Sequence, residues 1–296
     1  MRIPELYKIK KPVFSCEVFP PKPEYPLDTI YDTISKIRNL EPDFISVTYG
    51  AAGGTRERTE EISTEIKKKY GLETLMHLTS INSTRNEIES IISEIRESGI
   101  ENILALRGDI HKDADKESLS VDFNFASDLV KYIRQKGGFS IGVAGYPESH
   151  PESPDVKTDI VRLKEKVDAG ADFIISQMFF DNPLFISFME RVRSAGIDIP
   201  VSAGIMPVFR AGFVVNIVNL SNATIPPDLR VLIEKYGDNP EDMEKAGIEY
   251  SCRQISGLME NGVDGIHLYM MNRANLATEI ALNTGLRKIE GNKKNE

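Results

Sequence analysis

The stretch NEIESIISEIRESGIENILALRG, at residues 86–108, contains one complete helix–strand unit of this chain. Its first part, 86–98, repeats isoleucine at the spacing of a helix that buries one face. Its last part, 102–108, is a short apolar run that becomes polar at its end, which is typical of a buried strand. The stretch therefore predicts a helix packed against a strand. The isoleucines concerned are Ile88, Ile91, Ile92 and Ile95.

Similar units run along the whole chain. Strand starts recur about every 27 to 37 residues, with one gap of about 65 before the last strand. Strands that alternate with helices predict a parallel sheet, and eight units favour closure into a (β/α)8 barrel, a TIM barrel. A doubly wound open sheet is the alternative. The predicted strands are 13–19, 44–50, 74–80, 102–108, 139–146, 173–180, 200–208 and 265–271.

Helical patterns lie between these strands. One is predicted at 159–172, where Gly170 is a plausible stop. The long gap before the last strand contains extra helical sequence at 226–237 and 239–262. No composition break or linker marks a second domain. We therefore expect one barrel domain over residues 1–296, with its core at about 13–285 and a short flexible tail at 286–296.

Composition narrows the class of protein. The 296 residues are 41% hydrophobic and 27% charged with a net charge of −9, as in an ordinary soluble globular protein. Lysine and arginine are spread along the chain, so a nucleic-acid partner is not expected. Neither a signal peptide nor a membrane span is expected. Cys16 and Cys252 are the only cysteines, which excludes a disulfide scaffold and favours a reducing, cytoplasmic setting.

Polar residues occur at the carboxyl ends of the predicted strands. In β/α barrels these ends and the loops after them carry the catalytic groups. One polar strand end means little, but seven or eight at the same end of a barrel predict an active site. The residues are Glu17, Thr48, Tyr49, His77, Arg107, Gly108, Asp109, Tyr146, His150, Gln177, Tyr269 and Arg273.

Several of these residues have structural explanations as well. Glu17 could be the partner of an arginine, or a carboxyl group that burial keeps protonated near neutral pH for use as a general acid. Asp109 could cap the following helix, and His77 could be a satisfied core residue. We assign His267 to the core or the barrel lining.

Other chemistries are poorly supported. No predicted strand contains a lysine for a Schiff base, and no HxH, HExxH or tight carboxylate cluster indicates a metal site. The GxSxG match at 138–142 opens a strand, so we interpret it as chance. A Walker A loop and a GxGxxG fingerprint are absent after the first strand. What remains suits a planar, anionic cofactor and a small substrate that is protonated.

The motifs together resemble the methylenetetrahydrofolate reductase family. The segment SCEVFPP at 15–21 is similar to the family's FEFFPP, although Cys16 and Val18 replace aromatic residues and Phe125 stands where a tyrosine is common. The matches follow in family order over about residues 13 to 285. They are SVTYGA at 46–51, HLT at 77–79, LRGD at 106–109, YPE at 146–148, HPE at 150–152, KVDAGA at 166–171, Gln177 with FFD at 179–181, GIMP at 204–207 and NRA at 272–274.

The resemblance implies an FAD-dependent barrel that reduces methylenetetrahydrofolate to methyltetrahydrofolate, without the regulatory domain of animal members. Glu17 matches the acid that protonates a folate nitrogen, and Asp109 lies near both flavin and folate in the family. Substrate contacts are implied for Asp109, Gln177, Phe213 and Arg273. Flavin contacts are implied for Thr48, Tyr49, Ala51, His77, Arg107, Gly108, Asp109, Ala126, Tyr146, His150, Asp159 and Lys166.

The electron donor stays open between NADH, NADPH and an accessory protein. The apolar sequence around Phe213 and Ile217 differs from the family pattern, and it motivates the hypothesis of a flavin-carrying subunit in an electron-transfer complex. A third hypothesis is a cofactor-free lyase that uses Glu17 and His77. We also expect the chain to form a homo-oligomer.

Overall fold

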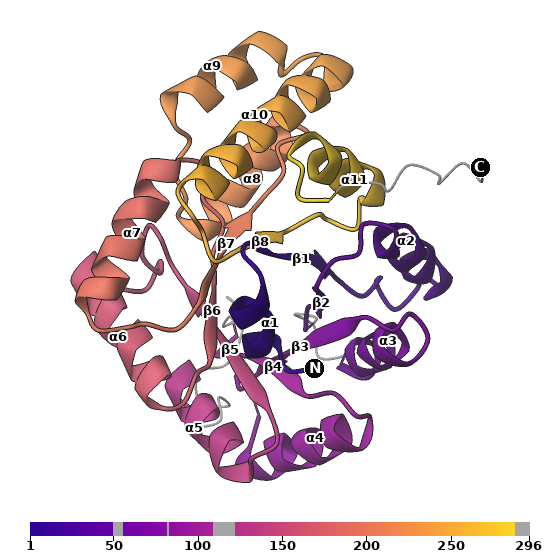
Figure 1. Ribbon diagram of the computed structural model, residues 1–296, viewed down its shortest axis with the longest axis vertical. Helices are drawn as coiled ribbons and strands as arrows, with labels where there is room; N and C mark the ends of the chain where they lie inside the picture. Colours follow the sequence, from indigo (N-terminus) through magenta and orange to yellow (C-terminus); the bar gives the residue numbers. More distant parts are fainter. Residues whose placement is uncertain (50–55, 82, 109–121, 288–296) are drawn as a thin grey trace.

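Eight parallel strands form a closed barrel in the computed structural model, which describes residues 1–49, 56–81, 83–108 and 122–287. Each strand pairs with the next in sequence, and the last pairs with the first (Figure 1). The predicted barrel is confirmed over the open sheet. The strands are β1 (Val13–Val18), β2 (Phe44–Val47), β3 (Glu73–Thr79), β4 (Asn102–Leu106), β5 (Ser140–Gly145), β6 (Phe173–Ser176), β7 (Val201–Ile205) and β8 (Gly265–Leu268).

Most of the predicted strands extend past the observed carboxyl ends. The strand predicted at 173–180, for example, ends at Ser176. Met178 and Phe180 beyond it are buried in a separate apolar cluster beside the barrel. The apolar run therefore predicted the burial of these residues correctly, but it did not predict where the strand ends. A buried strand and a buried loop give the same apolar pattern.

Alternate residues of each strand face the inside and the outside of the barrel. On β1, Phe14 and Cys16 pack in the outer core beneath the helices. Ser15 instead contacts His267 of β8 across the barrel interior. Both sets are fully buried, which explains why the strands are apolar with only a few polar positions. The interior near the amino ends is filled by Val13, Phe44, Leu75, Leu104, Phe173 and Ile175.

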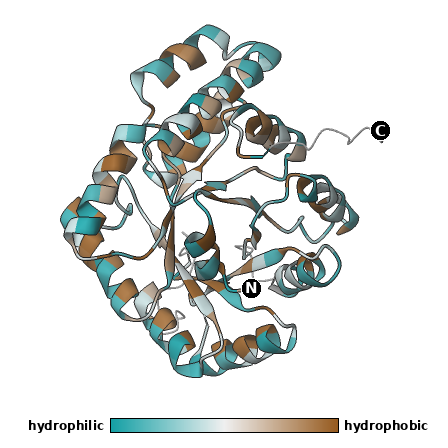
Figure 2. Cartoon of the chain, viewed as in Figure 1, coloured by the Kyte–Doolittle hydropathy of each residue, from teal (hydrophilic) through white to brown (hydrophobic). Residues whose placement is uncertain are grey.

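The surrounding helices carry hydrophilic and hydrophobic residues in alternation (Figure 2). The helix predicted at 86–98 is α4 (Arg85–Glu97), which buries all four of its predicted isoleucines and begins with a capping box between Thr84 and Glu87. The helix predicted at 159–172 is α6 (Val156–Asp168). The others that follow strands are α2 (Asp28–Arg38), α3 (Arg56–Lys68), α5 (Ala126–Lys136), α7 (Asn182–Ser194), α8 (Ala211–Ser221) and α11 (Ala274–Asn283).

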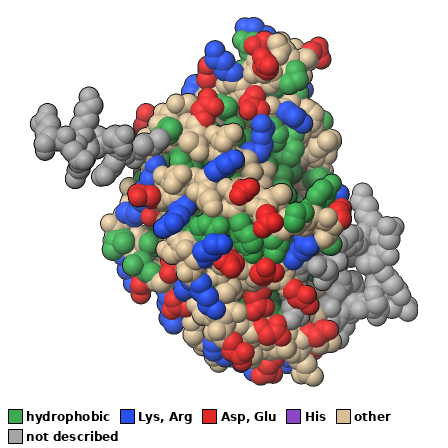
Figure 3. Space-filling view, turned by 90° about the vertical axis from the view of Figure 1, so that its right-hand side faces the viewer, with side chains coloured by type: hydrophobic (Ala, Val, Ile, Leu, Met, Phe, Trp, Pro, Cys, Tyr) green, Lys and Arg blue, Asp and Glu red, His purple; other side chains and the backbone are tan. Residues whose placement is uncertain are grey.

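Two additional helices precede β8, as predicted. They are α9 (Pro227–Tyr236) and α10 (Pro240–Glu260), which project at one side of the ring (Figure 1). Together with α8 they cover the second apolar cluster, which includes Met206, Val214 and Leu229. On the face drawn in Figure 3, acidic and basic side chains are interspersed around hydrophobic ones. Within the described residues, no helix has both the length and the apolar character needed to cross a membrane.

A short helix, α1 (Ile3–Ile9), covers the amino end of the barrel, at the centre of the ring in Figure 1. Ile3 and Leu6 are buried against the interior residues, and the Tyr7 hydroxyl lies 2.8 Å from Ser202 Oγ. The expected start of the core at about residue 13 is therefore wrong. Seven residues are too few to show a helical period, so this packing could not be predicted from the local pattern.

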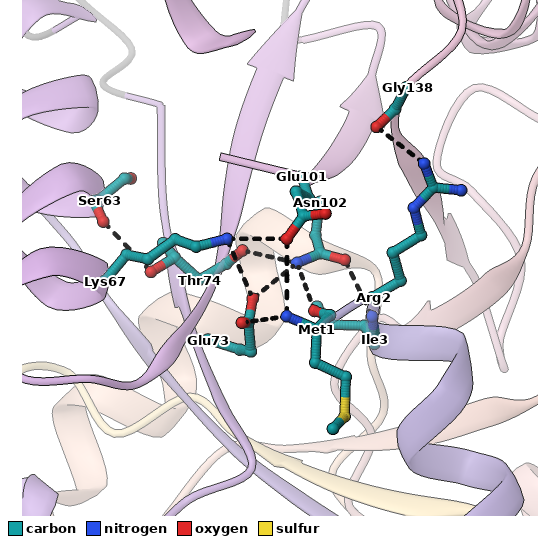
Figure 4. A network of polar contacts seen from close by, with 10 residues as sticks. All are labelled: Met1, Arg2, Ile3, Ser63, Lys67, Glu73, Thr74, Glu101, Asn102 and Gly138. Carbon is teal, nitrogen blue, oxygen red and sulfur yellow. Dashed lines mark hydrogen bonds and ion pairs between the residues drawn. The ribbon is translucent and has the colours of Figure 1, made fainter. Parts of the chain in front are cut away.

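Polar contacts anchor α1 beneath β3 and β4 (Figure 4). The Ile3 amide donates to Asn102 Oδ1 at 2.9 Å, and Asn102 in turn donates to Glu73. The amino group of Met1 forms ion pairs with Glu73 and, at 3.5 Å, with Glu101. These contacts lie at the end of the barrel opposite the polar carboxyl ends of the strands.

The first two residues of the expected tail belong to the folded part. Leu286 is buried, and Arg287 donates to the carbonyl oxygens of Leu40 and Glu41 and to the carboxylate of Asp43. The rest of that expected tail, 288–296, lies outside the described residues.

Candidate functional site

Glu17 points into the barrel from the carboxyl end of β1. Its Oε2 atom accepts a hydrogen bond from Ser46 of β2 at 3.3 Å. The same atom lies 3.5 Å from His77 Nε2 on β3 and 3.6 Å from His267 Nε2 on β8. Side chains from four strands thus meet at one carboxylate, whose side chain keeps 18% of its surface exposed.

His267 is held in one orientation by the barrel interior. Ser15 Oγ lies 2.7 Å from its Nδ1, and Ser46 Oγ lies 3.4 Å from its Nε2. The ring also stacks on Phe44 and meets Tyr269 edge-on. The assignment of His267 to the barrel lining is confirmed, but the sequence analysis missed its contact with Glu17. The two-residue spacing Ser15–Glu17 and His267–Tyr269 could have indicated that these side chains share the inner face.

The environment of Glu17 corrects both structural expectations for it. Burial alone would raise its pKa, but the contact with His267, the nearby His77 and the hydrogen bond from Ser46 together lower the pKa below its usual value. Glu17 is therefore a carboxylate at neutral pH and not a group kept protonated by burial. Its partners among the described residues are histidines and serine, not the arginine considered above.

His77 is the histidine on β3 that faces Glu17. Burial lowers its pKa to about 4, although Glu17 acts in the opposite direction, so the ring is neutral at physiological pH. Its Nε2 is covered and has no hydrogen-bond partner among the described residues. The same nitrogen lies 3.5 Å from Glu17 Oε2, without hydrogen-bonding geometry. The described residues contain no group of three or more His, Cys, Asp or Glu that could hold a metal ion.

Tyr269 and Gly204 lie close to each other and to the end of β6. The Tyr269 hydroxyl donates to the Ser176 carbonyl at 2.8 Å, and burial together with Glu17 and Tyr146 raises its pKa well above the usual range. A Cβ on Gly204 would lie 2.2 Å from the Ser176 carbonyl oxygen and 2.6 Å from the Tyr269 ring. Only glycine therefore lets β6, β7 and Tyr269 approach this closely.

The turn after β8 is tied to the end of β1. Asn272 Oδ1 accepts from the Phe19 amide at 3.1 Å, and its Nδ2 donates to the Phe19 carbonyl at 2.9 Å. Met271 and Asn272 both have positive φ angles, of 53° and 54°, a conformation that non-glycine residues rarely adopt. The strained turn places Arg273 at the start of α11, beside the strand that carries Glu17.

A second polar group follows β4 and β5. Arg107 donates to both carboxylate oxygens of Glu152, at 2.6 and 2.8 Å. The Glu152 amide donates to His150 Nδ1, and the His150 ring meets Tyr146 edge-on at 4.8 Å. Gly108 has a φ of +91°, and a Cβ there would lie 2.6 Å from Ile81, so this turn also requires glycine.

Lys166 and Asp159 of α6 complete this group. Lys166 Nζ donates to the Ala144 carbonyl at 2.5 Å and lies 5.9 Å from the centre of the Tyr146 ring. Burial lowers the pKa of Lys166 to about 8, against the opposing effect of Asp159. Burial raises the pKa of Asp159, which accepts from the His150 amide at 3.3 Å. A half-buried lysine that bonds no carboxylate among the described residues is a ready partner for an anion.

The predicted substrate residues lie on the other side of the barrel. Gln177 follows β6, and its Oε1 accepts from the Met178 amide. The Arg273 guanidinium lies 4.4 Å from the centre of the Phe209 ring, which in turn stacks on Phe213 at 4.6 Å. Arg273 also donates to Glu244 of α10 at 2.7 Å. The sequence analysis missed Phe209, Glu244 and Glu152, because nothing local to them indicates their partners.

The structure places most predicted site residues at one end of the barrel. Thr48 and Tyr49 follow β2, and the Thr48 amide donates to the Val18 carbonyl at 3.0 Å. Ala126 is the first residue of α5. Ala51 and Asp109 lie outside the described residues, so the geometry assigns them no place.

Fold and site together define a β/α-barrel enzyme with a partly buried carboxylate and a group of cationic and aromatic side chains at the carboxyl ends of its strands. The chain belongs to the methylenetetrahydrofolate reductase family, whose model matches residues 2–285. The resemblance seen in the motifs is thereby confirmed.

Named homologous proteins support this family assignment over nearly the whole chain. The 5,10-methylenetetrahydrofolate reductase of Escherichia coli strain K12 is 36% identical over 273 residues, covering 92% of this chain and 90% of that protein. An Arabidopsis thaliana protein named methylenetetrahydrofolate reductase (NADH) 1 is also 36% identical, over 92% of this chain but only 48% of its own length.

A solved structure shares the fold at low sequence identity. An uncharacterized protein from Clostridium thermocellum that binds two copies of 5-methyl-5,6,7,8-tetrahydrofolic acid superposes with a TM-score of 0.65 at 14% identity. The match covers 95% of this chain and 97% of the other. At this identity the likeness shows the fold alone.

Proposed function

We propose that this protein reduces 5,10-methylenetetrahydrofolate to 5-methyltetrahydrofolate, using FAD bound at the carboxyl end of the barrel. The observation that carries the proposal is Glu17, a partly buried carboxylate at the carboxyl end of β1, in a chain of the methylenetetrahydrofolate reductase family. Family membership indicates which substrate is reduced. The site contains a carboxyl group that can carry a proton, Glu17, and two cationic side chains, Arg107 and Lys166.

The residues around Arg107 and Lys166 fit an anionic, planar cofactor. Two cationic side chains lie next to two aromatic or imidazole rings, Tyr146 and His150, which suits a diphosphate joined to ring systems. When bound, FAD would accept a hydride equivalent from the electron donor and pass it to the methylene carbon of the folate.

Glu17 would supply the proton that the reaction needs. Transfer of its proton to a ring nitrogen of the substrate breaks the bond between that nitrogen and the methylene carbon. The carbon is left as an iminium cation that accepts the hydride, and Glu17 is left as a carboxylate. The hydrogen bond from Ser46 and the contact with His267 stabilise this carboxylate, which favours proton release.

Arg273, Phe213 and Gln177 would bind the rest of the folate. The stacked rings of Phe209 and Phe213 suit the aromatic p-aminobenzoyl group, and the Arg273 guanidinium suits a carboxylate of the glutamate tail. Asp109 is proposed from the family resemblance to stabilise the developing cation. It would need to carry a negative charge near the methylene carbon to do so.

The first pH prediction concerns the folate half-reaction. Because the pKa of Glu17 lies below its usual value, only a small fraction is protonated at neutral pH. Reduction of methylenetetrahydrofolate by the pre-reduced enzyme should therefore speed up by about tenfold for each unit that the pH falls, until the pKa is reached. Stopped-flow traces at a series of pH values measure this. A rate that rises with pH would contradict the assignment of Glu17 as proton donor.

A second pH prediction concerns flavin binding. Lys166 is charged below its pKa of about 8 and neutral above it, so its attraction for a diphosphate is lost as the pH rises. The dissociation constant for FAD should increase roughly tenfold between pH 7 and pH 9, measured by quenching of flavin fluorescence. Lys166→Met keeps the apolar stem and should bind FAD weakly with little pH dependence. An equal pH dependence in both proteins would assign the effect to another group.

One anaerobic assay tests the proposed function as a whole. The purified, FAD-loaded protein is mixed with NADH, NADPH or a reduced electron carrier, and then with methylenetetrahydrofolate. Formation of methyltetrahydrofolate supports the proposal, and the donor that works distinguishes a self-contained reductase from a subunit that receives electrons from a partner protein. Failure to bind FAD, with chemistry on a substrate in its absence, would replace the proposal with a cofactor-free lyase.

A further inference from the structure

Arg273 is already paired within the chain. Its Nη2 donates to Glu244 Oε2 at 2.7 Å, while its Nη1 is covered and has no hydrogen-bond partner among the described residues. The guanidinium lies against the Phe209 ring, which fixes its plane. A carboxylate of this protein is therefore already paired with the guanidinium at the site where the substrate is proposed to bind.

Glu244 also lines a polar pocket of about 370 Å³ at the mouth of the barrel. The pocket lies between the loop after β7 and helices α10 and α11, next to Arg273. Three of its side chains are acidic and two are basic, so it offers no net attraction for a further anion. Its lining consists of Arg210, Pro240, Glu241, Glu244, Lys245, Ile248 and Glu279.

We propose that Glu244 is an internal counter-ion of Arg273, which the glutamate carboxylate of the folate substrate displaces on binding. The inference rests on the proposed function and adds a residue that sets substrate affinity. Because Nη1 is covered and Nη2 is bonded to Glu244, a substrate carboxylate has to compete with Glu244 for this guanidinium. The released Glu244 would turn into the pocket, where Arg210 and Lys245 can receive it.

The ion pair between Arg273 and Glu244 is weak enough for a substrate carboxylate to replace Glu244. The side chains of Arg273 and Glu244 are 34% and 38% exposed, so solvent screens their attraction and keeps the pair weak. A weak internal pair keeps Arg273 ordered and its charge balanced in the free protein. It also lowers the apparent affinity for any substrate that must replace it.

The test compares Glu244→Gln with wild type on two substrates. With methylenetetrahydrofolate, which carries one glutamate, KM should fall roughly threefold to fivefold with kcat unchanged, because the competing charge is gone. With methylenetetrahydropteroate, which lacks the glutamate, KM should stay as in wild type. Glu249→Gln, an exposed position on the same helix with the same change in charge, is the matched control and should leave both KM values unchanged.

Other outcomes would overturn the inference. An unchanged KM in Glu244→Gln would mean that Glu244 does not compete, and a raised KM would mean that it orients Arg273 for the substrate. An equal fall in KM for both substrates, or an equal effect of Glu249→Gln, would indicate a general effect of charge. If wild type converts neither substrate, the proposed function itself has failed. Thermal melting of the Glu244→Gln protein, expected to match wild type, separates all of these from misfolding.

Discussion

Replacing Glu17 by glutamine is expected to slow reduction of methylenetetrahydrofolate by about a hundredfold to ten-thousandfold, the usual loss when a general acid is removed. Glutamine has nearly the same shape and can still accept from Ser46, but it has no proton to transfer to the folate nitrogen. Reduction of the bound flavin by its donor needs no proton from this residue and should proceed at nearly the wild-type rate. Stopped-flow absorbance of the flavin measures the two half-reactions separately.

The internal control in this experiment is the donor half-reaction. If both half-reactions slow together, Glu17 acts by shaping the flavin site and not as an acid. Folate turnover at the wild-type rate in Glu17→Gln would exclude the acid role altogether. Flavin content and melting temperature should match wild type, because the side chain remains partly exposed and loses no ion pair with lysine or arginine among the described residues.

Replacing Gly204 by alanine should have the largest effect on stability. The added Cβ would lie 2.2 Å from the Ser176 carbonyl oxygen, a backbone atom that cannot move without shifting β6. We expect a loss of at least about 3 kcal/mol in the free energy of unfolding, and a melting temperature lower by roughly 6–12 °C. Thermal unfolding followed by circular dichroism measures this.

Gly212→Ala is the matched control for this change. Gly212 lies eight residues further on, in the first turn of α8, and a Cβ there meets no atom within 4 Å. Its stability should change by no more than about 1 kcal/mol, in the direction of greater stability because alanine favours the helix. A Gly204→Ala protein that melts with wild type would show that β6 and β7 separate easily, which the close approach of Tyr269 to Ser176 argues against.

The barrel could be predicted from the sequence because its signals are local. The isoleucines of α4, the apolar strands and their regular recurrence each depend on residues within one unit. The end of a strand was harder to predict. Met178 and Phe180 are as apolar as the strand before them, but they are buried by α9 and α10 and not by strand pairing.

The sequence indicated which polar residues lie near the site better than it indicated how their charges interact. Glu17 and His77 are visible as polar residues in apolar strands, and the motif order identified the family. The sequence suggested burial as an influence on the pKa of Glu17, but it did not show the contacts that lower the pKa. His267, which reverses that influence, lies 250 positions away in sequence, and only closure of β8 onto β1 brings it to the carboxylate.

The sequence by itself therefore determined the repeating unit, the end of the barrel that carries the polar residues, and the family. The tertiary structure alone decided which charges meet: Glu17 with His77 and His267, Arg107 with Glu152, and Arg273 with Glu244. It also decided that α1 covers the far end of the barrel. The physical reason is distance along the chain. Periodicity and propensity act between near neighbours, whereas a pKa or an ion pair depends on groups that only the closed barrel brings within a few ångströms.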